Sequence, residues 1–564
     1  MFDIFPPYLV FFIGALVLPL LPNDSRRGIV SLIIPIICAY QIWEMPHGLH
    51  AELAFSGWEL TLLRVDKLSV IFGLVFSLAA FLSLLYAWHV RDTVQQVAAL
   101  GYAGSAIGAV FAGDLLTLFI FWEGTAITSV FLIWARRTEG AFATGMRYLV
   151  IQVASGVLLL GGVALLYNET GSIAFNAMTL GSAATWAIFL AFGIKCAFPL
   201  MHNWLQDAYP AATVTGTVIL SSFTTKLAVY ALARGFPGTE MLIYIGAVMT
   251  LFPIFYAVIE NDLRRVLAYS LNNQLGFMVV GVGIGTELAL NGTAAHAFAH
   301  ILYKSLLFMS VGAVLFRTGT AKGSELGGLY KTMPLTMIFC VVGAASISAF
   351  PLFSGFVTKS LILSDAAHEG YYIVWGILLF ASAGVFHHSG IKIPYFAFFA
   401  HDSGKRPKEA PTHMLLAMGI TAFLCIAIGV YPDPLYALLP YEVSYVPYTT
   451  THVITQLQLL FFSALAFTVL MRTGIYPPEL KSVNLDTDWT YRKFLPTILK
   501  RLTTSFSNIW MVAGWMIKMR LNRIVKRLHS SYGPEGRMAS VWPTGAMVLW
   551  IAVILGATMI VNFV

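Results

Sequence analysis

Charged residues are scarce in this chain. Asp, Glu, Lys and Arg make up only 11% of its 564 residues, whereas 58% are hydrophobic. Soluble domains carry roughly 25% charged and 45–50% apolar residues, and a single soluble core stops growing beyond about 250–300 residues. An apolar excess of this size, with a mean hydropathy of +0.77, excludes a soluble globular protein and predicts that a lipid bilayer is the solvent.

Cysteine is rare too, and the motifs of redox chemistry are missing. The four Cys have no CxxC spacing and lie in apolar stretches, at Cys38, Cys196, Cys340 and Cys425. They therefore favour packing roles over a disulfide framework or a metal site. The sequence also has no GxGxxG after a strand, so we expect no cofactor. The apolar N-terminus lacks a basic start and a small-residue cleavage site, which predicts a retained first helix.

Apolar stretches of about 20 residues, the length that crosses a bilayer as a helix, recur throughout the chain. They predict an all-α, polytopic transmembrane bundle of about 14–16 spans. The sixteen candidates lie near 6–22, 28–44, 68–90, 96–112, 115–135, 144–167, 183–206, 212–233, 242–259, 266–285, 290–316, 333–364, 371–399, 413–431, 453–471 and 541–563.

Basic residues are unevenly divided between the predicted loops. With the N-terminus outside, one side keeps little more than Arg64, Lys67 and Arg234. The other side holds Arg26, Arg27, Arg91, Arg136, Arg137, Arg264, Arg265, Arg317, Lys322, Lys331, Lys405, Arg406 and Lys408. Because positive loops stay in the cytoplasm, we expect a multi-pass protein of a bacterial cytoplasmic (inner) membrane with its N-terminus outside.

The segment 480–540 is basic and amphipathic. Nine Lys and Arg residues between Arg492 and Arg527 alternate there with large apolar residues. Such a segment lies on a membrane face or along a neighbouring subunit, although an ordinary cytoplasmic loop also fits. It accounts for much of the net charge of +7, so we expect no nucleic-acid partner.

Five charges lie deep inside apolar spans: Glu123, Lys195, Lys226, Lys304 and Lys359. A central charge costs at least about 2.5–3.5 kcal/mol, and such residues usually mark an ion or proton path. Any single one could instead snorkel or form a structural pair. Burial weakens the hold of an ammonium on its proton, and a nearby carboxylate strengthens it. A Glu–Lys pair can therefore load and release protons, and Glu123 is the natural partner of Lys195 or Lys226.

Two histidines extend this pattern. His296 and His300 precede Lys304 at helical spacings of eight and four, so the three groups share one helix face. A metal site is the alternative, but no third ligand lies near in the sequence, and the pattern favours a proton relay. His387 and His388 are adjacent and point about 100° apart on a helix, which favours an interior or cytoplasm-edge role for at least one.

The tetrapeptide AFPL occurs twice, with Pro199 four residues after Lys195 and Pro351 eight residues before Lys359. Helices broken at membrane depth are typical of ion paths and inverted repeats. We therefore expect two inverted five-helix repeats. The predicted regions are 1–95 (N-terminal helices), 96–235 and 240–400 (the repeats), 410–475 (C-terminal helices), 480–540 (basic surface segment) and 541–564 (final helix).

Segments between about 110 and 365 resemble the proton-translocating antiporter-like family, the large membrane subunits of respiratory complex I, Mrp-type cation/proton antiporters and membrane-bound hydrogenases. The segments are FIFWEGTAITSVFLIW, FGIKCAFPLMHNWLQDAYPAATVTGTVILSSFTTKLAVYALAR, ENDLRRVLAYSLNNQLGFM, HAFAHILYKSLLF and FPLFSGFVTKSLIL. The resemblance implies that Glu123 and Lys195 form a switching pair, that Lys226 and Lys304 continue the path past His296 and His300, and that Lys359 is the terminal site. It also implies coupling to neighbouring membrane subunits.

Among the branches of this family, the chain is most similar to the D-type subunits of the Mrp antiporters. That branch favours a transporter subunit over an enzyme, and implies that the subunit exchanges protons for a monovalent cation, with Na⁺ the favoured one. The alternatives are the proton-pumping subunit of a redox-driven complex and the energy-coupling subunit of an inorganic-carbon uptake complex. The usual PTPVSA-like turn reads PAATVTG at 210–216, and the extension beyond about 440 exceeds the usual length of the D-type subunits. Candidate cation ligands, by polarity alone, are Asp66, Asp114, Thr125, Ser221 and Ser222.

Overall fold

The computed structural model describes residues 4–22, 24–55, 57–480 and 484–563. It divides into two compact units, Met1–Asn484 and Leu485–Val564. Parts of three predicted regions lie outside the described residues: residues 1–3, 23 and 56 of the N-terminal region, residues 481–483 of the basic segment, and residue 564 of the final helix.

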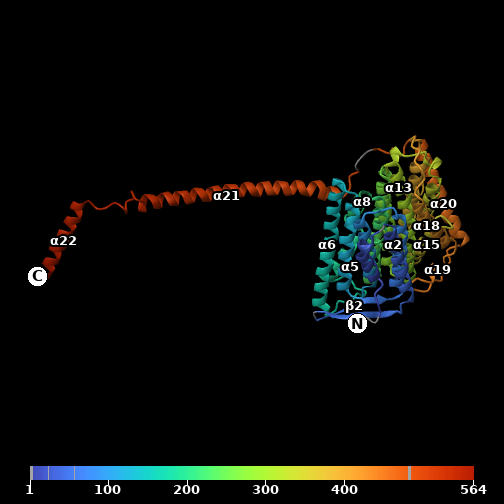
Figure 1. Ribbon diagram of the computed structural model, residues 1–564, viewed down its shortest axis with the longest axis horizontal. Helices are drawn as coiled ribbons and strands as arrows, with labels where there is room; N and C mark the ends of the chain where they lie inside the picture. The colour runs from blue at the N-terminus through green and yellow to red at the C-terminus, as the bar shows by residue number, and fades with distance from the viewer. Residues whose placement is uncertain (1–3, 23, 56, 481–483, 564) are drawn as a thin grey trace. The chain divides into compact units, whose positions relative to one another are not determined.

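The first half of unit 1 contains α1 (Leu9–Val17), η1 (Leu18–Leu20), α2 (Asp24–Glu44), β1 (Gly48–Phe55), β2 (Trp58–Val65), α3 (Lys67–Tyr86), α4 (Thr93–Phe111), α5 (Leu115–Trp134), α6 (Glu139–Thr170), α7 (Ala183–Lys195), α8 (Asn203–Ala211), α9 (Val214–Ser222) and α10 (Thr224–Gly235). The helices run roughly parallel to one another (Figure 1). Many begin at a side chain that accepts a hydrogen bond from a backbone N–H of the first turn, as is typical of helix N-caps. Among these caps are Asp66, Asp92, Asp114, Thr138, Ser182, Thr213, Asp262, Thr286 and Thr449.

The second half contains α11 (Met241–Ile259), α12 (Leu263–Ile284), α13 (Glu287–Thr318), η2 (Gly323–Glu325), η3 (Leu329–Lys331), α14 (Pro334–Ile347), α15 (Ser354–His368), α16 (Tyr372–Val385), η4 (Phe386–Ile391), α17 (Lys392–Pro394), η5 (Tyr395–Phe399), α18 (Thr412–Val430), α19 (Asp433–Tyr436) and α20 (Thr450–Arg472). Helix α13 packs against α3, α9, α12, α14, α15 and α18. In the most apolar 18-residue stretch of α13, 89% of the residues are buried, whereas in that of α20 only 17% are buried. Helix α13 is thus interior, whereas α20 lies at the surface of unit 1.

The all-α, polytopic class predicted from the sequence is confirmed. Among the described residues, twelve helices are long and apolar enough to cross a membrane, and three shorter apolar helices accompany them. The number is below the predicted 14–16 because two predicted spans are broken, the first is the shorter helix Leu9–Leu20, and 266–285 (α12) is not among the twelve. The broken spans 183–206 and 333–364 are the pairs α7/α8 and α14/α15, whereas 212–233, which is α9 followed by α10, counts as one of the twelve. The β1–β2 hairpin, which pairs Gly48 with Val65, was not predicted.

The two AFPL segments have the same backbone conformation. Ala197 and Leu200 have φ of 62° and 70°, and Ala349 and Leu352 have φ of 56° and 75°. In each copy the N–H of the Phe bonds to a carbonyl five residues earlier, at 3.0 Å. Positive φ is costly for residues other than Gly and recurs at functional sites. The surrounding structure must therefore stabilise both breaks.

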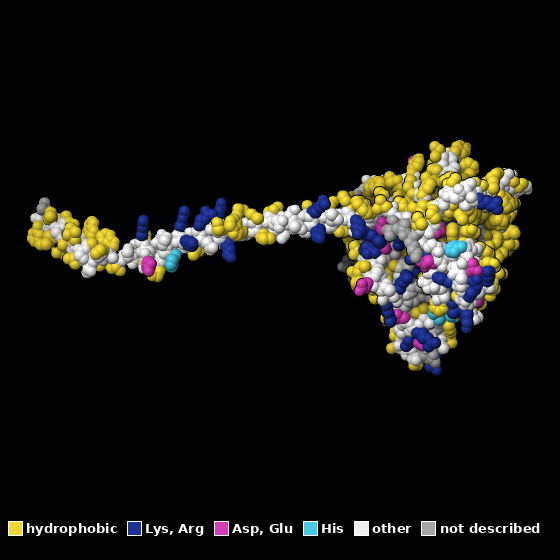
Figure 2. All heavy atoms as spheres, turned by 90° about the horizontal axis from the view of Figure 1, so that it is seen from above, with side chains coloured by type: hydrophobic (Ala, Val, Ile, Leu, Met, Phe, Trp, Pro, Cys, Tyr) yellow, Lys and Arg dark blue, Asp and Glu magenta, His cyan; other side chains and the backbone are white. Residues whose placement is uncertain are grey.

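The basic loops that were predicted to share a side contact one another at one end of unit 1. Arg91 pairs with Asp24 at 2.8 Å, and Arg137 with Asp92 at 3.0 Å. Figure 2, which looks onto the end opposite the β-hairpin, shows Lys and Arg gathered on this face with hydrophobic side chains around it. We call this face the basic end and the opposite face the hairpin end.

Unit 2 contains η6 (Thr490–Phe494), α21 (Leu495–Tyr532) and α22 (Thr544–Phe563). The helix α21 has 38 residues and no buried side chain, and its basic residues alternate with large apolar ones. It corresponds to the predicted basic amphipathic segment. The apolar side chains of α22 are exposed on all sides. A helix that is hydrophobic all round belongs in a membrane or against a partner.

Candidate functional site

Glu123 lies in the middle of α5 and is half-buried. Its carboxylate approaches α6 at Gly156, where an added Cβ would overlap the Glu123 Oε1 atom. Gly156 is therefore the residue that makes room for this side chain. Glu123 Oε1 has no hydrogen-bond partner among the described residues, so the carboxylate is free to accept a proton or a new partner.

Lys195 ends α7, two residues before the first AFPL break, and is fully buried. Its ammonium donates to the carbonyl of Trp122 at 2.5 Å and to the hydroxyl of Thr125 at 2.9 Å, and it lies 4.5 Å from the centre of the Trp122 ring. It interacts electrostatically with Glu123. The structure therefore brings Lys195, and not Lys226, to the turn of α5 that carries Glu123, which answers the question of partner left open by the sequence.

Lys226 lies in the first turn of α10, next to the break between α9 and α10, and is fully buried. Its ammonium donates to the carbonyl of Ser221 at 2.5 Å. Across this break Ser222 meets Ser305 of α13 at 3.2 Å. The preceding residue on α13, Lys304, is close enough for its charge to interact with that of Lys226. The Lys304 ammonium has no hydrogen-bond partner among the described residues.

His296 and His300 lie on the same face of α13 as Lys304, as their spacing predicted. The two imidazole centroids are 6.2 Å apart. His296 bonds on one side to Gln274 of α12 at 3.2 Å and on the other to Thr358 of α15 at 3.1 Å. Neither ring nitrogen of His300 has a partner in the described part of the chain. His296 thus links the α13 face to α15.

Lys359 follows Thr358 on α15 and is almost fully buried. Its ammonium reaches back across the second AFPL break to the carbonyl of Ile347 at 3.2 Å and lies 4.8 Å from the centre of the Phe277 ring. His300, which interacts electrostatically with Lys226 and Lys359, thus lies next to His296, which interacts with Lys359.

The seven residues predicted from the sequence, which we call the row, form two groups on α5, α7, α10, α13 and α15, and the groups adjoin where Cys196, next to Lys195, interacts with Lys226. The members of the row are Glu123, Lys195, Lys226, Lys304, His300, His296 and Lys359. The four lysines are fully or almost fully buried, and none forms a direct ion pair with a carboxylate among the described residues. An unpaired ammonium is costly to bury in an apolar environment. A row of such groups can pass protons between neighbours.

A family model described as "NADH:quinone oxidoreductase/Mrp antiporter, TM" matches residues 112–426, more than half of the chain. The chain belongs to this family. The match covers all seven residues of the row and both AFPL breaks.

Several relatives have assigned names. The D-type subunit of a Na⁺/H⁺ antiporter from Alkalihalophilus pseudofirmus is 27% identical over 472 residues, which cover 77% of this chain and 94% of that protein. Hydrogenase-4 component B from Escherichia coli (strain K12) is 27% identical over 423 residues, which cover 66% of this chain but only 63% of that relative.

Two solved structures have the same fold. A chain of the membrane-bound sulfane sulfur reductase, an archaeal respiratory membrane complex, aligns with a TM-score of 0.72 at 21% identity and covers 98% of this chain and 99% of that one. A chain of the Mrp complex from Dietzia sp. DQ12-45-1b aligns with a TM-score of 0.66 at 21% identity and covers 80% of this chain and 95% of that one. The antiporter-like fold thus recurs in complexes of both kinds.

One buried ion pair in this family member was not predicted. Lys392, in the span from α16 to η5, is fully buried and meets Glu479 at 2.9 Å. The signal was a lysine in the apolar stretch ASAGVFHHSGIKIPYFAFF. Glu479 gives no comparable signal, since it lies in a polar segment after α20.

The acidic residues suggested as cation ligands are engaged elsewhere, at the hairpin end. The Asp114 carboxylate accepts from the N–H of Thr61 at 2.8 Å and from the N–H and hydroxyl of Thr117 at 2.7 and 2.6 Å. Burial raises the pKa of Asp66, but its ion pair with Arg234 outweighs this effect and lowers the value to about 2. The two carboxylates therefore fasten the hairpin end to the bundle.

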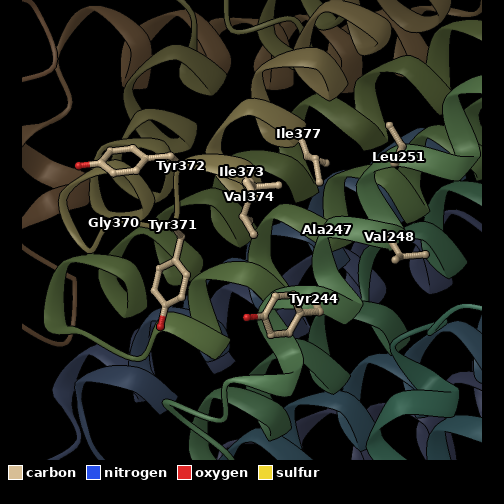
Figure 3. Close-up of a pocket in the computed structure, with 10 residues that line it drawn as sticks. All are labelled: Tyr244, Ala247, Val248, Leu251, Gly370, Tyr371, Tyr372, Ile373, Val374 and Ile377. Atoms are coloured by element: carbon tan, nitrogen blue, oxygen red, sulfur yellow. The ribbon is translucent and has the colours of Figure 1, made fainter.

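A surface pocket of about 500 Å³ lies between α11 and the start of α16. It is lined mainly by apolar side chains, among them Val248, Ile373 and Ile377, with Tyr244 and Tyr371 (Figure 3). It contains no residue of the row. Its lining is typical of a surface that faces lipid or another apolar chain.

Proposed function

We propose that this chain is the proton-translocating membrane subunit of a multisubunit monovalent cation/proton antiporter, with Na⁺ as the favoured cation. The observation that carries the proposal is the row of buried lysines and histidines, in which no lysine has a direct carboxylate partner among the described residues. The proposed proton-carrying residues are Glu123, Lys195, Lys226, His296, His300, Lys304 and Lys359.

The Glu123–Lys195 site is the proposed switch. When the two side chains close into an ion pair, the carboxylate stabilises the charged form of Lys195. When they separate, the buried ammonium loses that stabilisation and passes its proton toward Lys226. The hydroxyl of Thr125, which accepts from Lys195 at 2.9 Å, keeps the amine oriented in the separated state.

The half-buried position of Glu123 supports the need for partner subunits. A carboxylate at membrane depth is costly when it faces lipid. A second membrane subunit that covers the surface between α5 and α6 would remove this cost and would also bring the charge that moves Glu123. This inference agrees with the relatives, several of which are named as parts of larger assemblies.

The proposed orientation places the basic end in the cytoplasm and the hairpin end outside, with the N-terminus outside, in a bacterial inner membrane. The charge asymmetry between the two ends supports it. The repeated AFPL conformation likewise supports the division into repeats at 96–235 and 240–400.

A second candidate is the proton-pumping subunit of a redox-driven complex. Its support is the respiratory complex chain, whose fold covers 98% of this chain, whereas the Mrp complex chain covers 80%. In that case electron transfer in partner chains, and not a cation gradient, drives the same row.

The test is proton flux in vesicles. The chain is expressed with its neighbouring genes, a pH gradient is imposed, and its collapse is followed after addition of Na⁺, K⁺ or Li⁺. We expect a cation-dependent collapse in the wild type, and its loss in Lys195→Ala and Glu123→Ala. Lys322→Ala, in an exposed loop at the basic end, is the matched control and keeps the flux.

Unchanged flux in both site variants contradicts the proposed path. A wild type without any cation response contradicts the antiporter and favours the redox-driven candidate. That candidate is tested with the same variants, by proton uptake after an electron donor is added.

A further inference from the structure

Lys392 lies where the span from α16 to η5 leaves regular α-helical geometry. Residues 386–391 and 395–399 are π-helical, and Pro394 follows Lys392 by two. Stretches of π-helix are uncommon and frequent at functional sites. This geometry turns the Lys392 side chain toward the C-terminal end of α11, where it is fully buried.

Three backbone carbonyls already satisfy the Lys392 ammonium. It donates to Ala257, Val258 and Glu260 at 3.2, 2.6 and 2.7 Å. An ammonium has three hydrogens, and the last carbonyls of a helix carry its negative partial charge. The carboxylate of Glu479 at 2.9 Å is therefore not needed to complete the hydrogen bonding. A lysine with a purely structural role would be complete without it.

Glu479 is itself nearly buried, with 6% of its side chain exposed. It lies at the basic end, in the segment after α20, where the other nearby carboxylate is Glu260. Burial raises the pKa of the Glu479 carboxyl above its usual range, although Lys392 opposes this shift. Its Oε2 atom has no hydrogen-bond partner among the described residues, so one oxygen is free to take up a proton.

A line of buried polar groups leads from Glu479 toward the row. The Tyr476 ring stacks on His387 at 5.5 Å, and the next residue, His388, is fully buried. The Nε2 atoms of both histidines have no partner in the described part of the chain. Lys304 is close enough to interact electrostatically with the ring of His388. Buried polar groups of this kind normally bond to ordered water, which would complete a proton path.

We propose that Glu479 and Lys392 form a proton-uptake gate at the basic end, which feeds Lys304 of the second repeat through His388. The inference rests on the proposed function and adds a second point of access, separate from the Glu123–Lys195 switch. The carboxylate takes a proton on its free oxygen, which weakens its pairing with Lys392, and the proton then moves past His388 to the amine of Lys304.

The vesicle assay tests this gate with Glu479→Gln, which keeps the shape of the side chain but does not titrate. We expect its flux to fall by about tenfold or more, and Glu479→Asp to keep most of the wild-type flux. Asp402→Asn is the matched control, because Asp402 forms a surface ion pair with Arg406 at the same end, and it keeps the wild-type flux. His388→Asn breaks the line at its inner end and lowers the flux by a similar factor.

The outcomes separate the two proposals. If Glu123→Ala abolishes flux while Glu479→Gln and His388→Asn keep it, the gate is wrong and the proposed function stands. If Glu123→Ala keeps wild-type flux, the proposed function fails first. If Glu479→Gln and His388→Asn both fail to assemble in the membrane, Glu479 and His388 are structural and the gate is wrong. Loss of flux in Glu479→Asp equal to that in Glu479→Gln also counts against it.

Discussion

The two AFPL breaks have the same backbone conformation but differ in where the lysine near each break lies in the sequence. Lys195 lies two residues before the first break, and at the same distance before the second break stands Ile347. The amine in the second repeat comes from Lys359, which follows the break and reaches back to the carbonyl of Ile347 at 3.2 Å. The residue that corresponds to Lys359 in the first repeat is Asp207, which pairs with Arg147.

This difference teaches that a buried lysine accompanies both breaks, although it precedes the first and follows the second and the two amines bond to different elements. A broken helix exposes backbone carbonyls that attract a cation, and Lys359 reaches one of them across the second break, whereas Lys195 bonds to the carbonyl of Trp122 on α5. The repeats differ in the acid as well. The first has the half-buried Glu123 near its lysine, whereas the carboxylate that we assign to the second path is Glu479.

The largest effect is expected from moving the amine in the second repeat. Lys359→Leu should lower proton flux by about 100-fold, since it removes a proton carrier. Adding Ile347→Lys to that variant places an amine in the position of Lys195 and should recover at least about a tenth of the flux. Flux is measured in the same vesicles, at matched abundance of the complex.

The control for this rescue is Leu361→Lys in the Lys359→Leu background, because Leu361 is buried on the same helix but does not precede the break. If Ile347→Lys rescues no better than Leu361→Lys, the two breaks are equivalent in backbone only.

An intermediate effect is expected at Gly156. In Gly156→Ala the added methyl group would overlap the Glu123 carboxylate, so the side chain must shift from its position near Lys195. Because a displacement of about 1 Å can cost up to about 100-fold in a positioned site, we expect flux to fall by about tenfold or more. Gly161→Ala, on the same helix with nothing within 4 Å of the new Cβ, should behave as wild type. Equal flux in the two variants would show that the position of Glu123 does not matter.

The smallest effect concerns the strain of the breaks. Leu200 and Leu352 have positive φ and side chains that are 75% and 55% exposed. Replacing either by Gly removes a conformational cost of about 1 kcal/mol with little loss of packing. We expect each variant to raise the melting temperature of the purified complex by about 1–2 °C. Leu49→Gly, at another exposed leucine, is the control and should not stabilise. A lower melting temperature in both break variants would mean that lipid or a partner packs on these side chains.

Much of the fold was predictable because hydropathy is a property of each stretch of chain by itself. The positions of the apolar spans, the basic segment that becomes α21, and the five buried charges all follow from local composition and its cost in a bilayer. The number of uninterrupted helices was not predictable to the same degree. Whether an apolar run such as 212–233 is broken depends on neighbours, here on Tyr102 and Phe76, which pack around Phe223.

The sequence by itself determined that this protein lies in a membrane, which family it belongs to and which residues are costly enough there to require a function. Only the tertiary structure decided which of these residues meet. Lys195 contacts the turn that carries Glu123, and Lys359 reaches back to Ile347. Lys392 pairs with Glu479, which lies 87 positions further along the chain (479 − 392). The physical reason is that these contacts depend on how broken helices pack and how far a lysine side chain extends, and neither is recorded in the local pattern of residues.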